Sequence, residues 1–111
     1  MNLKIFILSL LTFILFAACY NGEDVKGKIV IEYNGEWTAM ITEDYNESSC
    51  SGNGASTFNY TNPDRLKITA SKLDSTLNKL IIYIYEDERI AAEGSTREPQ
   101  GSANAAYEFP Y

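Results

Sequence analysis

Apolar and polar side chains alternate with a period of two along most of the chain after residue 25. The clearest runs are residues 29–33, 37–41, 66–70 and 80–84. No window keeps the spacing of three and four residues that marks one face of a helix. Because successive side chains of a strand point to opposite faces, these runs predict strands with one buried face. The chain is therefore expected to be all-β.

The pair Asn34-Gly35 separates the first two of these runs. Both residues accept positive φ, so the pair predicts a two-residue type I′ hairpin. Trp37 falls on the apolar face of the returning strand, together with Ala39 and Ile41. We expect Trp37 to be buried in the core.

The remainder of the chain predicts further short strands separated by turns. Residues 43–54 are polar and rich in Asn, Ser and Gly, which indicates a loop, whereas residues 55–60 suit a short strand that ends at the Pro-containing turn 61–64. A single helical turn is expected in residues 72–79. Residues 80–85 are apolar on both faces, which predicts a central strand or a partner on the second face.

Two last strands are expected at residues 89–94 and 102–109, with a turn between them at residues 98–101. About seven short strands joined by turns favour two packed sheets over a barrel. The prediction is a single immunoglobulin-like, two-sheet antiparallel β-sandwich over residues 26–111.

The N-terminal segment differs from this domain in composition. Lys4 precedes an apolar run over residues 5–18, and the run ends in Ala17-Ala18-Cys19. Its fourteen residues would span about 21 Å as a helix, less than the ~30 Å of a hydrocarbon core. A short apolar run behind a positive charge predicts a cleaved helical signal segment, residues 1–18. The alternative is an uncleaved membrane anchor.

The segment Phe16-Ala17-Ala18-Cys19 resembles the lipobox of prokaryotic lipoproteins, with Phe16 where Leu is usual. The resemblance implies that Cys19 becomes the lipid-bearing first residue, for example with palmitate. Residues 19–25 then form a short linker. The expected location is the extracytoplasmic face of a cell membrane, on the periplasmic side, in the outer membrane or at the cell surface.

Composition narrows the classes of partner. Of the 111 residues, 45% are hydrophobic and 22% are charged, which excludes a disordered chain. Acidic residues outnumber basic ones 15 to 9, for a net charge of −6. Nucleic-acid binding is not expected, because it requires clustered Lys and Arg. The membrane is expected to be a partner through the lipid anchor alone, since anionic headgroups repel such a surface.

The domain itself resembles the small MmpS-like β-sandwich domains of bacterial and archaeal lipoproteins, over about residues 27–109. The segments that carry the resemblance are Trp37-x-Ala39, Thr57-Phe58, Pro63-Asp64-x-Leu66-x-Ile68-x-Ala70, Leu80-x-Ile82-x-Ile84 and Gly101-x-Ala103 to Tyr107. The family often has Asp-Gly where this chain has Asp87-Glu88. The resemblance implies an immunoglobulin-like, membrane-tethered and non-catalytic domain.

Candidate catalytic chemistry is sparse. The chain has no histidine, and Ser71 and Lys72 are strand neighbours that point to opposite faces. The lysines are expected to be solvated. Two acidic clusters remain, Glu43-Asp44-x-x-Glu47 and Glu86-Asp87-Glu88. Either could offer a weak Ca²⁺ site or paired carboxylates for glycoside hydrolysis, but turn charges in solvent are the simpler interpretation. No cofactor is expected.

Three further features have structural and functional alternatives. Cys50 is an inert thiol or, if Cys19 is not lipidated, the partner of Cys19 in a disulfide. Asn46 and Asn59 each begin an N-glycosylation sequon. The alternating aromatic residues at 107, 109 and 111 complete the core or form a platform for a partner or a glycan.

Taken together, the sequence predicts a lipid-anchored extracytoplasmic β-sandwich that acts as a non-catalytic binding or accessory module of the cell envelope. An envelope protein or a glycan is the expected partner. The alternatives are a structural subunit of a membrane transport assembly and a small envelope hydrolase that uses carboxylates.

The lipobox generates a direct prediction. Substitution Cys19→Ser should abolish incorporation of radiolabelled fatty acid and release the protein from the membrane fraction, because the thiol is the site of acylation. Cys50→Ser is the matched control and should label normally. Unchanged labelling of Cys19→Ser would contradict the assignment.

Overall fold

Eight antiparallel strands form two stacked sheets of four strands each in the computed structural model, which describes residues 24–110. The predicted signal segment, Cys19 and Tyr111 lie outside the described residues. The strands are β1 (Lys26–Glu32), β2 (Glu36–Glu43), β3 (Asn46–Asn53), β4 (Ser56–Thr61), β5 (Arg65–Lys72), β6 (Leu80–Glu86), β7 (Arg89–Thr96) and β8 (Ser102–Glu108). The predicted all-β, two-sheet architecture is confirmed.

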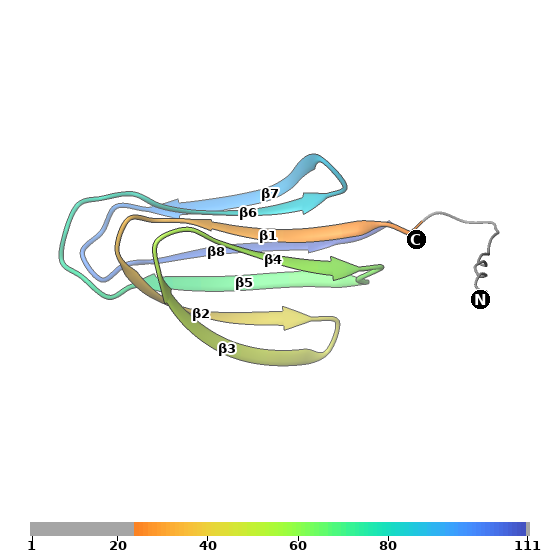
Figure 1. Cartoon of the computed structure of the whole chain (residues 1–111), viewed down its shortest axis with the longest axis horizontal. Coiled ribbons are helices and arrows are strands. Elements are labelled where there is room, and N and C mark those ends of the chain that lie inside the picture. The colour runs from red at the N-terminus through yellow and green to blue at the C-terminus, as the bar shows by residue number, and fades with distance from the viewer. Residues whose placement is uncertain (1–23, 111) are drawn as a thin grey trace, which may run out of the picture.

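The strand orders are β4-β1-β6-β7 in one sheet and β3-β2-β5-β8 in the other (Figure 1). Two hairpins, β2–β3 and β6–β7, stay within one sheet, and every other connection crosses to the opposite sheet. Both hairpins, the start of β1 and the end of β8 lie at the right-hand end in Figure 1. We call this the N-terminal end of the sandwich and the opposite one the distal end.

The core lies between the sheets and is built from alternate residues of each strand. On β6, for example, Leu80, Ile82 and Ile84 are fully buried, and Trp37 on β2 is 1% exposed, as predicted. Its indole Nε1 donates a hydrogen bond to the carbonyl of Gly54 at 2.8 Å. The buried apolar set is Ile29, Ile31, Tyr33, Trp37, Ala39, Ile41, Leu66, Ile68, Ala70, Leu80, Ile82, Ile84, Ala103, Ala105 and Phe109.

The prediction of a loop at residues 43–54 was wrong, and the strand count of about seven was therefore too low. Residues Asn46–Asn53 form β3, which pairs with β2 along its whole length. β3 is an edge strand with mostly exposed side chains. Backbone hydrogen bonds to β2 stabilise β3, and few of its own side chains are buried. An apolar alternation is therefore not needed in β3, and the sequence shows none.

The predicted Asn34-Gly35 hairpin was also wrong. β1 pairs with β4 and β6, whereas β2 pairs with β3 and β5, so this pair links two sheets rather than two neighbouring strands. Neither residue has positive φ. The two true hairpins turn at Asp44, with φ 58°, and at Asp87, with φ 55°. A permissive sequence allows a tight hairpin but does not force one when the flanking strands find better partners.

The two long sides of the sandwich differ. On one side β7 approaches β8 so closely that a Cβ at Gly94 would lie 2.2 Å from the backbone oxygen of Asn104. A side chain at this position would have to push the two strands apart. On the other side, the partly buried Cys50, Phe58 and Tyr60 of β3 and β4 pack against the core.

Lys72 departs from the expectation that the lysines are solvated. Its side chain points to the face opposite Ser71, as predicted. That face is the inside of the sandwich, so Lys72 is only 1% exposed. Its Nζ donates to the carbonyls of Thr76, at 2.6 Å, and Arg97, at 3.2 Å, and lies 5.6 Å from the ring centroid of Tyr33. These bonds satisfy the buried ammonium and fix two distal loops against each other.

The helical turn predicted for residues 72–79 is absent from the segment between β5 and β6. More generally, residues 24–110 contain no helix that is long and apolar enough to cross a membrane. Side chains organise this segment instead. The Tyr33 hydroxyl donates to Asp74 Oδ1 at 2.5 Å, and the Thr76 hydroxyl donates to the same oxygen at 2.8 Å. Both bonds lower the pKa of Asp74, and the bond from Tyr33 has the larger effect.

Lys72→Met should lower the free energy of unfolding by about 2–4 kcal/mol, because Met keeps the length of the side chain but leaves two carbonyls without their charged donor. Urea denaturation of the full chain measures the loss. Lys67→Met is the control, since Lys67 lies exposed on the same strand and should change stability by less than about 0.5 kcal/mol. Equal losses in both variants would show that the buried bonds contribute nothing.

Candidate functional site

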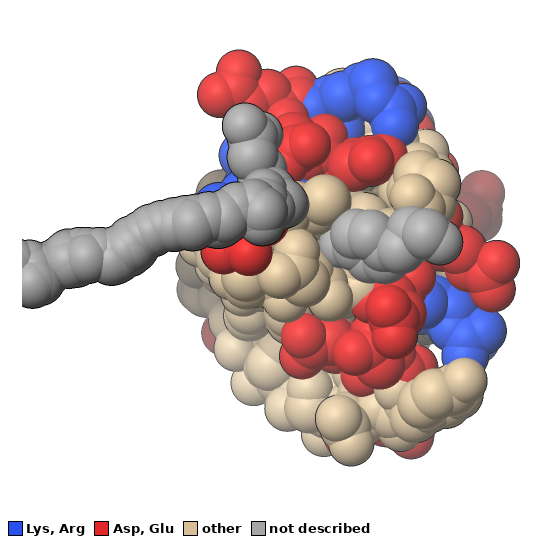
Figure 2. Space-filling model, turned by 90° about the vertical axis from the view of Figure 1, so that its right-hand side faces the viewer, with Lys and Arg blue, Asp and Glu red and all other residues tan. Residues whose placement is uncertain are grey.

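Acidic side chains gather at the N-terminal end of the sandwich (Figure 2). Within the described residues, the strand ends and turns there carry eight carboxylates and three cations. The acidic residues are Asp24, Glu43, Asp44, Asp64, Glu86, Asp87, Glu88 and Glu108, and the basic ones are Lys26, Arg65 and Arg89. Both acidic clusters singled out in the sequence have members at this end, which makes it the first place to look for ligand chemistry.

The predicted weak metal ligands Glu43, Asp44 and Glu47 are not arranged as a ligand set. Asp44 Oδ1 accepts hydrogen bonds from the backbone amides of Asp64, at 2.7 Å, and Arg65, at 3.2 Å. Glu43 and Glu47 lie on opposite faces of the sheet, because Glu47 pairs with Thr42 rather than with Glu43. Over residues 24–110 no group of three His, Cys, Asp or Glu side chains could hold a metal ion.

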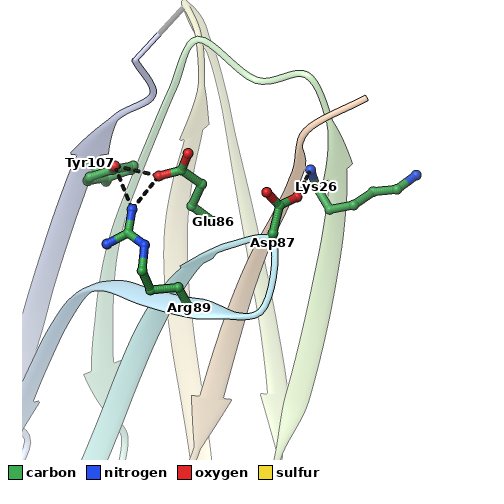
Figure 3. Close-up of polar contacts among 5 residues, drawn as sticks. All are labelled: Lys26, Glu86, Asp87, Arg89 and Tyr107. Carbon is green, nitrogen blue, oxygen red and sulfur yellow. Dashed lines mark hydrogen bonds and ion pairs between the residues drawn. The ribbon is translucent and has the colours of Figure 1, made fainter. Parts of the chain in front are cut away.

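The second acidic cluster ties strands together (Figure 3). Glu86 Oε1 accepts from the Tyr107 hydroxyl at 2.6 Å and from Arg89 Nη2 at 2.6 Å. Asp87 Oδ1 accepts from the backbone amide of Lys26 at 3.0 Å. These bonds join the β6–β7 hairpin to β8 and to the start of β1. The carboxylates of Glu86 and Asp87 therefore stabilise the packing of these strands.

Phe109 belongs to the core, and the partly buried Tyr107 packs against it, so these two rings do not form an exposed platform. Phe109 is 6% exposed, and the two rings meet edge to face with centroids 4.9 Å apart. The structural alternative, completion of the core, is confirmed for these two residues. Tyr111 lies outside the described residues.

The single cysteine and the two sequon asparagines in the described residues lie on edge strands. Cys50 on β3 is free and half-buried, and burial raises the pKa of its thiol. A higher pKa leaves less thiolate and makes the thiol less reactive. Asn46 opens β3 and Asn59 lies on β4, and both are exposed. Glycosylation at either asparagine stays a prediction.

An aromatic surface lies on the outer face of the β4-β1-β6-β7 sheet. Because Leu80, Ile82 and Ile84 point inward, Tyr83 and Tyr85 of the central strand β6 point outward. Their ring centroids are 6.1 Å apart, with planes inclined at 53°. Of the two alternatives predicted for this strand, the central position in its sheet is confirmed, and within residues 24–110 no further element covers the outer face.

The neighbouring strands supply the rest of this surface. Val30 pairs with Tyr83 from β1, and Glu93 pairs with Tyr83 from β7. Lys28 pairs with Tyr85 from β1, and Ile90 pairs with Tyr85 from β7. We name this set the tyrosine face, defined as Lys28, Val30, Glu32, Ile81, Tyr83, Tyr85, Ile90 and Glu93. Its centre is aromatic and aliphatic, and its margin is charged.

The electrostatics of the two tyrosines differ. Lys28 Nζ lies over the ring of Tyr85, 4.5 Å from its centroid, which is a cation–π contact. Burial raises the pKa of the Tyr83 hydroxyl, and the charges of Glu32 and Glu93 raise it further. Tyr85 is therefore paired with a cation of its own chain, whereas Tyr83 lies in a negative environment.

Sequence reasoning identified the apolar second face of β6 but not its surroundings. Lys28 and Glu32 are distant from Tyr83 in the chain and lie near it only because β1 is adjacent to β6, whereas Glu93 is placed opposite Tyr83 by the register of the β6–β7 hairpin. No local pattern in the sequence could have indicated the charges that β1 contributes.

The other sheet has a different outer face. A shallow hollow of about 460 Å³ lies across β3, β2 and β5 and is lined mainly by hydroxyl side chains around Met40, which is 43% exposed. The outward residues are Thr38, Met40, Ser49, Ser51, Thr69 and Ser71. The lining of this hollow contains no aromatic ring and no charged side chain, although Glu36, Glu47 and Lys67 lie on the same outer face of the sheet.

Comparison of the chain with protein-family models, with curated proteins and with solved structures gives no significant match. The identification of a candidate site therefore rests on the geometry of this protein alone.

The geometry of the acidic turns predicts no calcium dependence. The melting temperature of the full chain should be the same, within about 1 °C, in millimolar Ca²⁺ and in EDTA, because Asp44 already binds two amides. A site saturated a hundredfold above its Kd would instead stabilise the fold by about 2.7 kcal/mol. A clear calcium-dependent rise that Asp44→Asn removes would contradict this expectation.

Proposed function

We propose that this protein is a non-catalytic binding module of the cell envelope and that the tyrosine face is its contact surface. The observation that carries the proposal is the pair of outward rings, Tyr83 and Tyr85, on a central strand that nothing else in residues 24–110 covers. Tyr is enriched at binding surfaces because its ring contributes a large apolar area at low cost in side-chain entropy. A charged margin around an apolar centre is also typical of interfaces.

The arrangement of the carboxylates favours binding over hydrolysis. Glu86 and Asp87 accept hydrogen bonds from Tyr107, Arg89 and the backbone of Lys26, and these bonds hold the hairpin in place. A general acid or base must instead be free to exchange a proton with a substrate. The envelope hydrolase is therefore the less supported alternative. A subunit of a transport assembly would use the same face for contact.

The proposed attachment is a lipid on Cys19, followed by the short linker to β1, in an immunoglobulin-like lipoprotein domain. In this arrangement the acidic N-terminal end faces the bilayer. Repulsion from anionic headgroups holds that end away from the membrane. The tyrosine face runs along the side of the sandwich, so it stays open to a partner that stands beside the domain.

Site-specific cross-linking tests the proposal. A benzophenone amino acid placed at Tyr83 should give cross-linked adducts with an envelope component in intact cells, because the ring position lies within the proposed contact. The adducts are detected as shifted bands on a denaturing gel and identified by mass spectrometry.

The matched control is the same amino acid at Tyr45, which is 90% exposed in the β2–β3 turn and lies outside the tyrosine face. It should give no defined adduct. Defined adducts from position 45 with none from position 83 would refute the assignment of the contact surface.

A further inference from the structure

We propose that the tyrosine face binds a protein partner through a positively charged side chain, Lys or Arg, which lies on the ring of Tyr83 between Glu32 and Glu93. This inference rests on the proposed function and adds the chemistry of the partner.

The positions of the two carboxylates follow from the sheet register. Glu93 on β7 lies directly opposite Tyr83, and Ser95 is opposite Ile81. Glu32 on β1 pairs with Ile81 and is therefore the diagonal neighbour of Tyr83 on the other side. One ring thus has a carboxylate on each flanking strand.

Neither carboxylate is neutralised by a cation of residues 24–110. The side chains of Glu32 and Glu93 form no ion pair and no hydrogen bond within this part of the chain, and both are exposed. This differs from Glu86, which is paired with Arg89 at 2.6 Å. The one cation of the face, Lys28, pairs with Tyr85 instead, one row along the strands. The charge of the partner that would complement Tyr83 is therefore positive.

The intramolecular contact of Lys28 shows the geometry that the partner would repeat. An ammonium or guanidinium on a tyrosine ring is attracted by the negative face of the π system, and nearby carboxylates add to this attraction. The ring of Tyr85 already has such a cation at 4.5 Å. The ring of Tyr83 has the two carboxylates beside it, and no cation of residues 24–110 lies over it.

The aliphatic residues of the face favour a protein over a neutral glycan. Val30, Ile81 and Ile90 surround the rings, and Ile90 is 46% exposed. They offer apolar area to the side-chain stems of Lys or Arg and to apolar neighbours. A neutral glycan could donate hydroxyl hydrogen bonds to the two carboxylates but would leave their charge uncompensated, whereas a cation compensates it. The net charge of −6 also opposes a polyanion or an anionic lipid surface.

The test measures binding of fluorescein-labelled peptides to the full chain, kept in a polyoxyethylene detergent that carries neither sugar nor charge. One peptide of about ten residues alternates Lys and Val, and its matched partner alternates Glu and Val. Labelled chitohexaose and cellohexaose serve as neutral glycan probes. Fluorescence anisotropy reports the affinity of each probe.

The Lys peptide should bind and the Glu peptide should not. Tyr83→Ala should weaken binding of the Lys peptide about tenfold, and the double change Glu32→Gln with Glu93→Gln about fivefold to tenfold. Binding should also weaken as NaCl rises from about 0.05 to 0.5 M. The charge-matched control Glu36→Gln with Glu47→Gln removes the same net charge from exposed positions on the other sheet and should leave the affinity within about twofold.

The outcomes separate this inference from the proposed function. Binding of a neutral hexasaccharide that is lost in Tyr83→Ala but unchanged in the Glu-to-Gln double variant would overturn the inference and leave the binding face in place. Equal weakening by the two double variants would also overturn it, because net charge rather than the local pair would then be responsible. Absence of Lys-peptide binding overturns it as well, whereas failure of cross-linking at position 83 in cells would overturn the proposed function itself.

Discussion

The structure depends on the burial of alternate side chains between two sheets. Once Leu80, Ile82 and Ile84 are inside, the period of two leaves Ile81, Tyr83 and Tyr85 no position except the outer face. A slip of one residue would exchange the two sets, and it is opposed by the loss of three fully buried side chains from the core. The same interactions that stabilise the fold therefore display the tyrosine face.

The two ends of the sandwich are held by different chemistry. At the N-terminal end, carboxylates accept hydrogen bonds from backbone and side chains, as Asp44 does from Asp64 and Arg65. At the distal end the central group is a cation, Lys72, which donates to two carbonyls in separate loops. Each set satisfies backbone groups that the crossing connections leave without strand partners. Three of the six acidic residues that the sequence offers as ligands, Asp44, Glu86 and Asp87, thus accept hydrogen bonds that stabilise the turns.

Glu32 and Glu93, the two carboxylates beside Tyr83, are among the charged side chains of residues 24–110 that form no ion pair. Glu86 has Arg89, and Lys28 has the ring of Tyr85, whereas Glu32 and Glu93 have no partner within residues 24–110. A surface with an apolar centre and unsatisfied charge at its margin is suited to recognising a complementary surface, because each unpaired charge gains from an opposite one. A position beside the membrane on a short linker would bring this face to other envelope components.

The sequence by itself determined the all-β class, the inward faces of the main strands, the burial of Trp37 and the second apolar face of β6, because each of these follows from local alternation. The tertiary structure alone decided the rest. Backbone pairing with β2 makes the polar segment Asn46–Asn53 a strand, and the sheet to which β2 belongs prevents Asn34-Gly35 from forming a hairpin. The burial of Lys72 depends on the carbonyl of Thr76, four residues along the chain, and on that of Arg97 in the distant β7–β8 connection, while strand order brings Glu32 beside Tyr83. Strand order is set by long-range packing, which a local pattern of residues does not encode.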